Sequence, residues 1–235
     1  MANEPQGAPR TPNLDKMSDA EVHTYFEQKL LDIESELAQG AGQEDSVAYA
    51  KLLLEQANAL LGLNQKAEMW QPAQQALAVF IDNEAWEEAV TACDILYQSE
   101  QPAAVTALVH GVWLAIAFPI DPELSLTMLN HIIDEMPANA DGAAVAAVTA
   151  HYIVSLRANE TQYQNLNFAT TGLIAYVAKR HSQVDSQDLM DFWMNKLQLK
   201  DPAIFLPRMG MVLNAIVKPD EWWFDRDKIR EKLPD

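Results

Sequence analysis

The chain has 235 residues, 49% of them hydrophobic, and a formal net charge of −18. This is enough apolar material for one large helical domain or two small ones, which excludes a disordered or fibrous chain. The single cysteine, Cys93, excludes an internal disulfide framework and a cysteine-based zinc cluster, so we expect a reducing, cytoplasmic setting.

The charges are distributed unevenly along the chain. Residues 1–66 hold 5 Lys and Arg against 11 Asp and Glu, residues 67–156 hold none against 12, and residues 157–235 hold 11 against 11. The carboxylates of the middle block, residues 67–156, must therefore face water, cap helices or meet cations from elsewhere. Nucleic acid is not expected as a ligand, because binding it requires clustered Lys and Arg.

Helix signals follow one another along the whole chain. Residues 1–17 lack an apolar stretch behind a cationic start, which predicts a disordered lead rather than a signal peptide or anchor. A capping box, Ser18 with Glu21, predicts the first helix, which ends at Gly40 and Gly42. Further helices are predicted within 46–61, 71–81, a segment capped by Asp82 or Asn83 that runs to Tyr97, then 102–118, 122–136, 142–156, 163–180 and 186–197, one from Pro202 that Pro207 kinks or restarts, and a last one that opens with Glu221–Phe224.

These signals predict an all-α protein, because strand alternation and hairpin turns are lacking. We expect antiparallel helical hairpins that form either an irregular α-solenoid-like array or a compact bundle of about ten helices. The tetratricopeptide repeat pattern finds only scattered apolar matches. The most apolar run, Ala103–Phe118, is too short for a membrane span. The expected domains are the lead at 1–17, a helical-hairpin domain at 18–200, and an extension at 201–235 that packs on it or projects from it.

Three histidines raise the question of a metal site. His110, His131 and His151 lie near the middle of three consecutive predicted helices, so their imidazoles could meet at one height. Each is also typical of a core histidine that hydrogen-bonds to a carbonyl or hydroxyl group, and no metal-binding motif supports the first interpretation. We therefore predict no cofactor and keep a metal-dependent enzyme as an alternative.

Other catalytic candidates have simpler interpretations. Cys93 lies among small apolar residues and is typical of a buried hydrophobe rather than a nucleophile. The carboxylate pairs Glu87/Glu88 and Asp134/Glu135 point about 100° apart on a helix and are typical of a solvated face. Phosphate-binding glycine loops and the GxSxG motif are missing from the sequence.

An acidic helix and an aromatic tail remain as candidates for binding. Trp222, Trp223 and Phe224 precede alternating cations and acids, which indicates either a recognition element or a segment folded back on its own acidic block. We predict a non-catalytic protein–protein interaction module, such as an adaptor, assembly factor or accessory subunit, that presents an acidic helical surface to a basic protein partner. A structural homo-oligomer and a hydrophobic ligand in the alanine-rich centre stay open. The predicted partner-binding residues are Glu84, Glu87, Glu88 and Asp94, on the fourth helix, with Trp222, Trp223 and Arg226.

Overall fold

The protein is all-α. The structure, a computed structural model, describes residues 14–42 and 44–233, and these contain helices and no strand. The predicted lead therefore lies mostly outside the described residues, apart from a short 3-10 helix at Leu14–Lys16. No helix of this described part is both long and apolar enough to cross a membrane. The helices are α1 (Asp19–Ala38), α2 (Ser46–Gly62), α3 (Trp70–Asp82), α4 (Trp86–Gln98), α5 (Ala104–Ala117), α6 (Pro122–Asp134), α7 (Asp141–Arg157), α8 (Glu160–Ser182), α9 (Gln187–Lys196), α10 (Pro202–Ile216) and α11 (Arg226–Arg230), with a second 3-10 turn at Pro219–Glu221.

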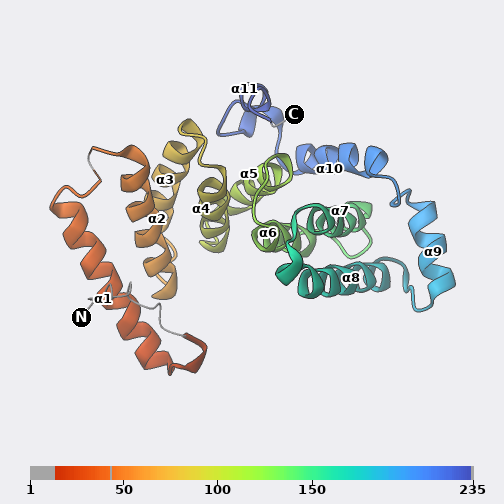
Figure 1. Ribbon diagram of the computed structural model, residues 1–235, viewed down its shortest axis with the longest axis horizontal. Coiled ribbons are helices and arrows are strands. Elements are labelled where there is room, and N and C mark those ends of the chain that lie inside the picture. The colour runs from red at the N-terminus through yellow and green to blue at the C-terminus, as the bar shows by residue number, and fades with distance from the viewer. Residues whose placement is uncertain (1–13, 43, 234–235) are drawn as a thin grey trace, which may run out of the picture.

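The helices form a row of neighbouring pairs rather than a single closed bundle. From α1 to α8 each helix packs against the next one along the chain, as in a solenoid. The row turns at its far end, where α10 comes back to contact α7 and α5 (Figure 1). The C-terminal segment then crosses above α4 and α5, so α11 lies near the middle of the row.

Side-chain caps account for most helix starts. Ser18 and Glu21 form the predicted capping box, and Asp45 accepts hydrogen bonds from the amides of Val47 and Ala48. Asp121 and Asp201 cap α6 and α10, each followed by a proline in the first turn. Pro207 lies inside α10, which continues through it to Ile216, so the helix does not restart there.

The start of α4 differs from the prediction. Its N-cap is Ala85, and neither Asp82 nor Asn83 caps it. Asn83 instead closes α3, where its side-chain amide donates to the carbonyl of Val79 at 2.8 Å. Glu84 follows with a φ of 58°, so it lies in the turn before α4 and not on the helix.

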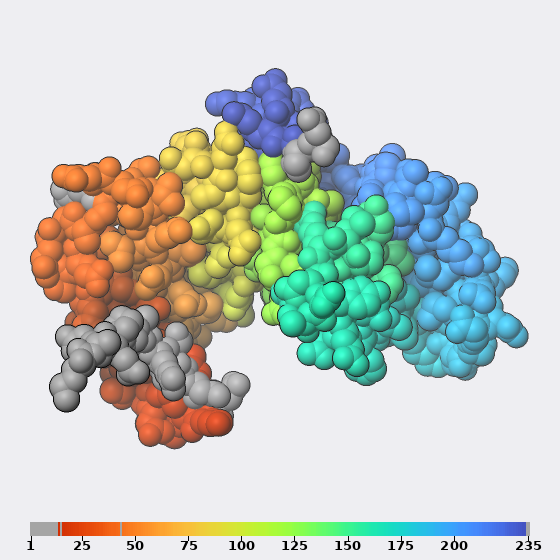
Figure 2. Space-filling model, in the orientation of Figure 1, coloured from red at the N-terminus to blue at the C-terminus, as the bar shows by residue number. Residues whose placement is uncertain are grey.

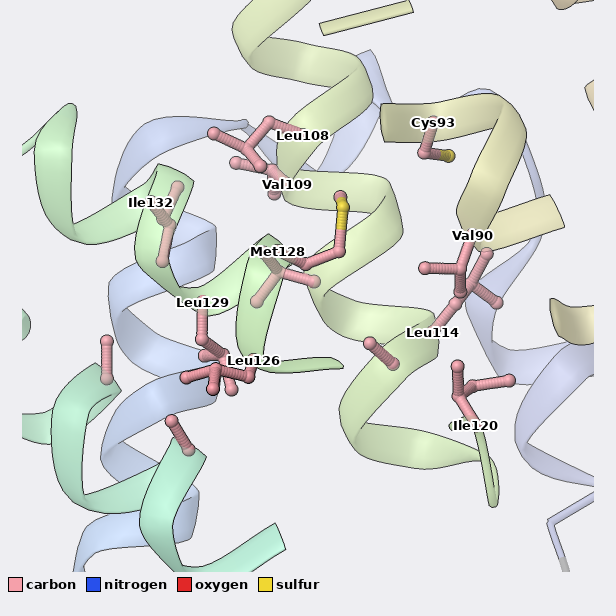
Figure 3. Close-up of a cluster of buried hydrophobic side chains, with 14 of the residues drawn as sticks. Val90, Cys93, Leu108, Val109, Leu114, Ile120, Leu126, Met128, Leu129 and Ile132 are labelled. Carbon is pink, nitrogen blue, oxygen red and sulfur yellow. The ribbon is translucent and has the colours of Figure 1, made fainter. Parts of the chain in front are cut away.

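Figure 3 shows part of the core, where buried side chains of α4, α5 and α6 such as Val90, Leu108 and Met128 pack together. Gly111 allows α5 to approach its neighbours closely: a Cβ there would lie 2.3 Å from the Cε of Met128 and 2.7 Å from the Cβ of Cys93. Along α7, every residue from Ala143 to Ala150 is buried, because small side chains let helices pack on several sides of it.

Arginines of the C-terminal third close the carboxyl ends of other helices. Arg157 donates to the carbonyls of Ala115 (2.7 Å) and Ile116 (2.9 Å) at the end of α5. Arg180 donates to the carbonyl of Ile133 at the end of α6, and Arg208 to that of Leu197 after α9. Carbonyls at a helix end lie beyond the regular hydrogen bonds of the helix, and a cation also suits the negative end of the helix dipole. The carbonyl of Ile133 accepts a further hydrogen bond, from the amide of Met136 at 3.2 Å.

The C-terminal extension at 201–235 shares the core of the rest of the chain. Phe205, Met209 and Leu213 of α10 are buried in the same cluster as α5 and α7. The predicted helix opening at Glu221–Phe224 is wrong: Trp222 is extended, with φ −75° and ψ 135°, and α11 begins only at Arg226. In this extended segment the rings of Trp222, Trp223 and Phe224 all reach His110, whereas three successive residues of a helix point about 100° apart.

Candidate functional site

The four predicted acidic residues have different surroundings. Glu84 lies 2.8 Å from the ammonium of Lys232, and Glu88 lies 2.9 Å from that of Lys51. This ion pair lowers the pKa of the Glu88 carboxyl. Asp94, with a side chain 17% exposed, lies 3.2 Å from the Nε2 of His131, and Glu87 is exposed in the first turn of α4. Lys51 from the N-terminal part of the chain and Lys232 from the C-terminal part therefore each meet one of these carboxylates.

The middle block as a whole keeps an excess of acidic groups. Of its 12 carboxylates, Glu84, Glu88 and Glu100 meet lysines in the described part of the chain, the last one Lys66. Asp121 caps α6, while Asp94 and Asp141 lie beside histidines. Six exposed carboxylates meet no Lys, Arg or His among the described residues: Glu68, Asp82, Glu87, Glu123, Asp134 and Glu135, the last of which accepts a hydrogen bond from the hydroxyl of Tyr97.

The aromatic tail packs onto its own chain, around His110 of α5. The imidazole lies 4.6 Å from the ring of Trp222, 4.7 Å from that of Trp223, on which it stacks, and 5.0 Å from that of Phe224. The backbone amide of Trp223 donates to the Nε2 of His110 at 3.0 Å, and the Nδ1 of His110 lies 2.5 Å from the carbonyl of Thr106. Both ring nitrogens are thus engaged, which fits a neutral histidine with its proton on Nδ1.

Polar contacts fix the rest of this segment. The guanidinium of Arg226 lies 3.9 Å from the ring centre of Trp222 and donates to the side chain of Asn214 at 2.8 Å. With the ion pair between Lys232 and Glu84, these contacts hold the segment from Trp222 to Lys232 across the helices. Figure 2 shows it as a cap over the middle of the row.

A groove of about 730 Å³ runs between this cap and α3. Apolar and aromatic side chains line much of it: Leu77, Ala78, Ile81, Trp86, Trp223 and Phe224. Three carboxylates, Asp82, Glu84 and Asp225, and two lysines, Lys228 and Lys232, also line it. A groove of this size and mixed lining suits a short stretch of a partner chain or a small amphipathic molecule.

The three central histidines have no partner in common. His110 faces the tail, His131 lies beside Asp94 and the ring of Tyr97, and His151 is 2.9 Å from the hydroxyl of Thr170 through its Nδ1. Among the residues that the structure describes, no three His, Cys, Asp or Glu side chains are grouped so that they could hold a metal ion. Cys93 is fully buried, and burial raises the pKa of its thiol, which disfavours the thiolate.

The buried histidine predicts a pH dependence of stability. The pKa of His110 is lowered from 6.5 to about 4, mainly by burial and to a smaller extent by the nearby Arg226, against the opposing contact with Thr106. The unfolded chain therefore takes up this proton first as the pH falls. The contribution of His110 to the free energy of unfolding is full above about pH 6.5 and is lost towards pH 4, with a slope of at most about 1.4 kcal/mol per pH unit.

Urea unfolding of the wild type and of His110→Gln between about pH 7 and about pH 4.5 tests this prediction. We expect the wild type to lose more stability than the variant over this range, since glutamine accepts the bond from Trp223 but does not titrate. A stability difference that stays constant with pH would contradict it.

The groove could not be predicted from the sequence, because it depends on a contact between residues 110 and 223. The available signal was the run of three aromatic residues followed by cations, which suggested a segment folded back on the acidic block. Comparison of the chain with family models, with curated proteins and with solved structures gave no match.

Proposed function

We propose that the protein is a non-catalytic interaction module that presents an acidic helical surface to a basic partner protein. The observation that carries the proposal is the groove between α3 and the C-terminal segment, which combines an aromatic lining with carboxylates at its edge. Aromatic anchors surrounded by charged groups are typical of protein interfaces.

The chemistry of the groove defines the partner. Trp86, Trp223 and Phe224 offer contact to an apolar or aromatic side chain. Asp82 is exposed beside them, and Glu87 is exposed in the first turn of the next helix. A partner segment that carries an apolar residue next to Lys or Arg would contact both the aromatic side chains and these carboxylates.

The internal lysines weaken the negative field without removing it. Lys232 already lies on Glu84 and therefore competes with a partner's cation for this carboxylate. The middle block still holds 12 carboxylates, of which three meet a lysine among the described residues. Such a field accelerates the encounter with a basic protein and weakens as salt is added.

A charge-reversal series tests the proposal. The double variant Asp82→Lys/Glu87→Lys is compared with Glu34→Lys/Glu36→Lys, which changes the net charge equally at exposed positions of α1. Proteins that co-purify with the wild type at low salt are quantified for each variant. We expect the first variant to lose about 10-fold or more of the bound partner and the second to lose little.

Two further results would separate a specific groove from general electrostatic attraction. Lys232→Ala is expected to increase partner binding, because it frees Glu84. Binding is also expected to decrease from low to moderate ionic strength. Equal losses in both double variants, or binding that does not respond to salt, would overturn the proposed surface.

A further inference from the structure

Helix α8 has an outer face without charge. Residues 161–178 of this 23-residue helix include no Asp, Glu, Lys or Arg. Its inner face, with Leu166, Thr170, Val177 and Ala178, is buried, and α7 is its main neighbour. Phe168 on the outer face is 81% exposed, the highest value among the large hydrophobic side chains that the structure describes.

Six of the exposed residues of α8 form a straight stripe. They are spaced alternately by four and three positions, which keeps them on one side of a helix and is the spacing of a coiled-coil seam. All of them are exposed: Thr161, Asn165, Phe168, Gly172, Ala175 and Lys179.

Gly172 has no role within the single chain. A Cβ at this position would meet no atom within 4 Å, and its φ is that of an ordinary helical residue. Glycine in the middle of an exposed helix costs about 0.5–1 kcal/mol relative to alanine. Its effect is to leave a flat place on the stripe, one turn away from the exposed ring of Phe168.

We propose that this stripe, from Thr161 to Lys179, is the contact between two copies of the chain, with the two α8 helices antiparallel. A twofold axis at the level of residue 170 pairs Phe168 of each copy with Gly172 of the other. The same axis pairs Thr161 with Lys179. The ring then fills the flat place on the other copy, and this happens twice in the dimer.

The charge distribution favours this face as the place where a second copy docks. A chain with a net charge of −18 repels its own copy, most strongly where the middle block faces another middle block, so contact is least opposed at a face without charge. The stripe is uncharged between its ends, and the antiparallel arrangement brings Lys179 of one copy towards Glu160 of the other. The two helix ends are thus complementary in the arrangement that seats Phe168 on Gly172.

The size of the contact indicates a weak, reversible dimer. A helix of 23 residues is about 34 Å long and about 10 Å wide, so each copy contributes a footprint of roughly 340 Å². This is below the area of a standard stable interface, so we expect the dimer to dissociate on dilution.

The mass in solution tests the proposal. Sedimentation equilibrium of the full chain from about 1 µM to about 200 µM should show a shift from 26.2 kDa towards twice this mass. Phe168→Lys is expected to weaken association at least about 100-fold, because the change acts at both symmetric contacts. Phe192→Lys on α9, a side chain 64% exposed, is the matched control and should leave association unchanged.

Two further variants distinguish this contact from a general loss of folding. Gly172→Leu should raise the stability of the monomer, because leucine is the better helix former, and should abolish the dimer by occupying the place of Phe168. Oxidation of Asn165→Cys/Ala175→Cys should crosslink two copies in the antiparallel register, while Cys93 is buried. A wild type that stays at 26.2 kDa over the whole range, or a dimer that Phe168→Lys leaves intact, overturns the proposal.

Discussion

Replacement of Gly111 by alanine is expected to destabilise the protein by about 1–3 kcal/mol, although alanine is the better helix former. The new Cβ would lie 2.3 Å from the Cε of Met128 and 2.7 Å from the Cβ of Cys93. The methionine end can rotate away, but the Cβ of Cys93 is fixed to α4. The two helices must therefore separate, and the contacts of the buried residues between them weaken.

Gly210→Ala is the matched control for this prediction. Gly210 lies in α10, and a Cβ there would meet no atom within 4 Å. Its replacement should stabilise the protein by about 0.5–1 kcal/mol, through helix propensity alone. Urea unfolding of both variants measures the two effects. If Gly111→Ala is as stable as the wild type, Gly111 does not set the distance between α4 and α5.

Arg157→Ala is expected to cost about 2–4 kcal/mol, since hydrogen bonds from a charged donor are worth about 1.5–3 kcal/mol each and part of this value is lost to solvent screening. The guanidinium donates to two carbonyls at the end of α5, and one of them belongs to the fully buried Ala115. Burial lowers the pKa of this guanidinium, so the site is partly removed from water.

Two companion variants separate geometry from charge at this site. Arg157→Lys keeps the charge but cannot reach two carbonyls with a planar group, so we expect it to recover only part of the lost stability. Arg180→Ala removes a single hydrogen bond, to Ile133, and should cost less than Arg157→Ala. Urea unfolding gives the stability of the three variants. If Arg157→Lys is as stable as the wild type, the contact with two carbonyls has no role in stability.

The helix array was largely predictable from local signals. Ser18, Asp45 and Asp121 cap helices within two or three residues of themselves, so the sequence alone reveals their effect. The central trio of helices was marked by apolar runs between prolines. The expectation that carboxylates of the middle block would meet water, helix caps or distant cations agrees with the contacts of Asp82, Asp121 and Glu84.

The candidate site was less predictable because it joins distant parts of the chain. His110 and Trp223 are separated by 113 positions, and no local pattern links them. The placement of Glu84 on a helix was wrong because the turn before α4 uses a positive φ at a residue with a side chain. The sequence shows that each of the three histidines lies near the middle of its helix. It does not show the direction of each side chain, which depends on how the helix is rotated.

The arginines at the helix ends have a consequence for the order in which the chain matures during its synthesis. The carbonyls of Ala115 and Ile133 are translated 42 and 47 residues before the arginines that close them. At roughly 5–20 residues per second, α5 and α6 emerge from the ribosome several seconds before their closing partners. The carboxyl ends of α5 and α6 thus lack these arginine contacts until α7 and α8 have been made. The contact of Lys232 with Glu84 at the groove can form only after the C-terminal segment has been made.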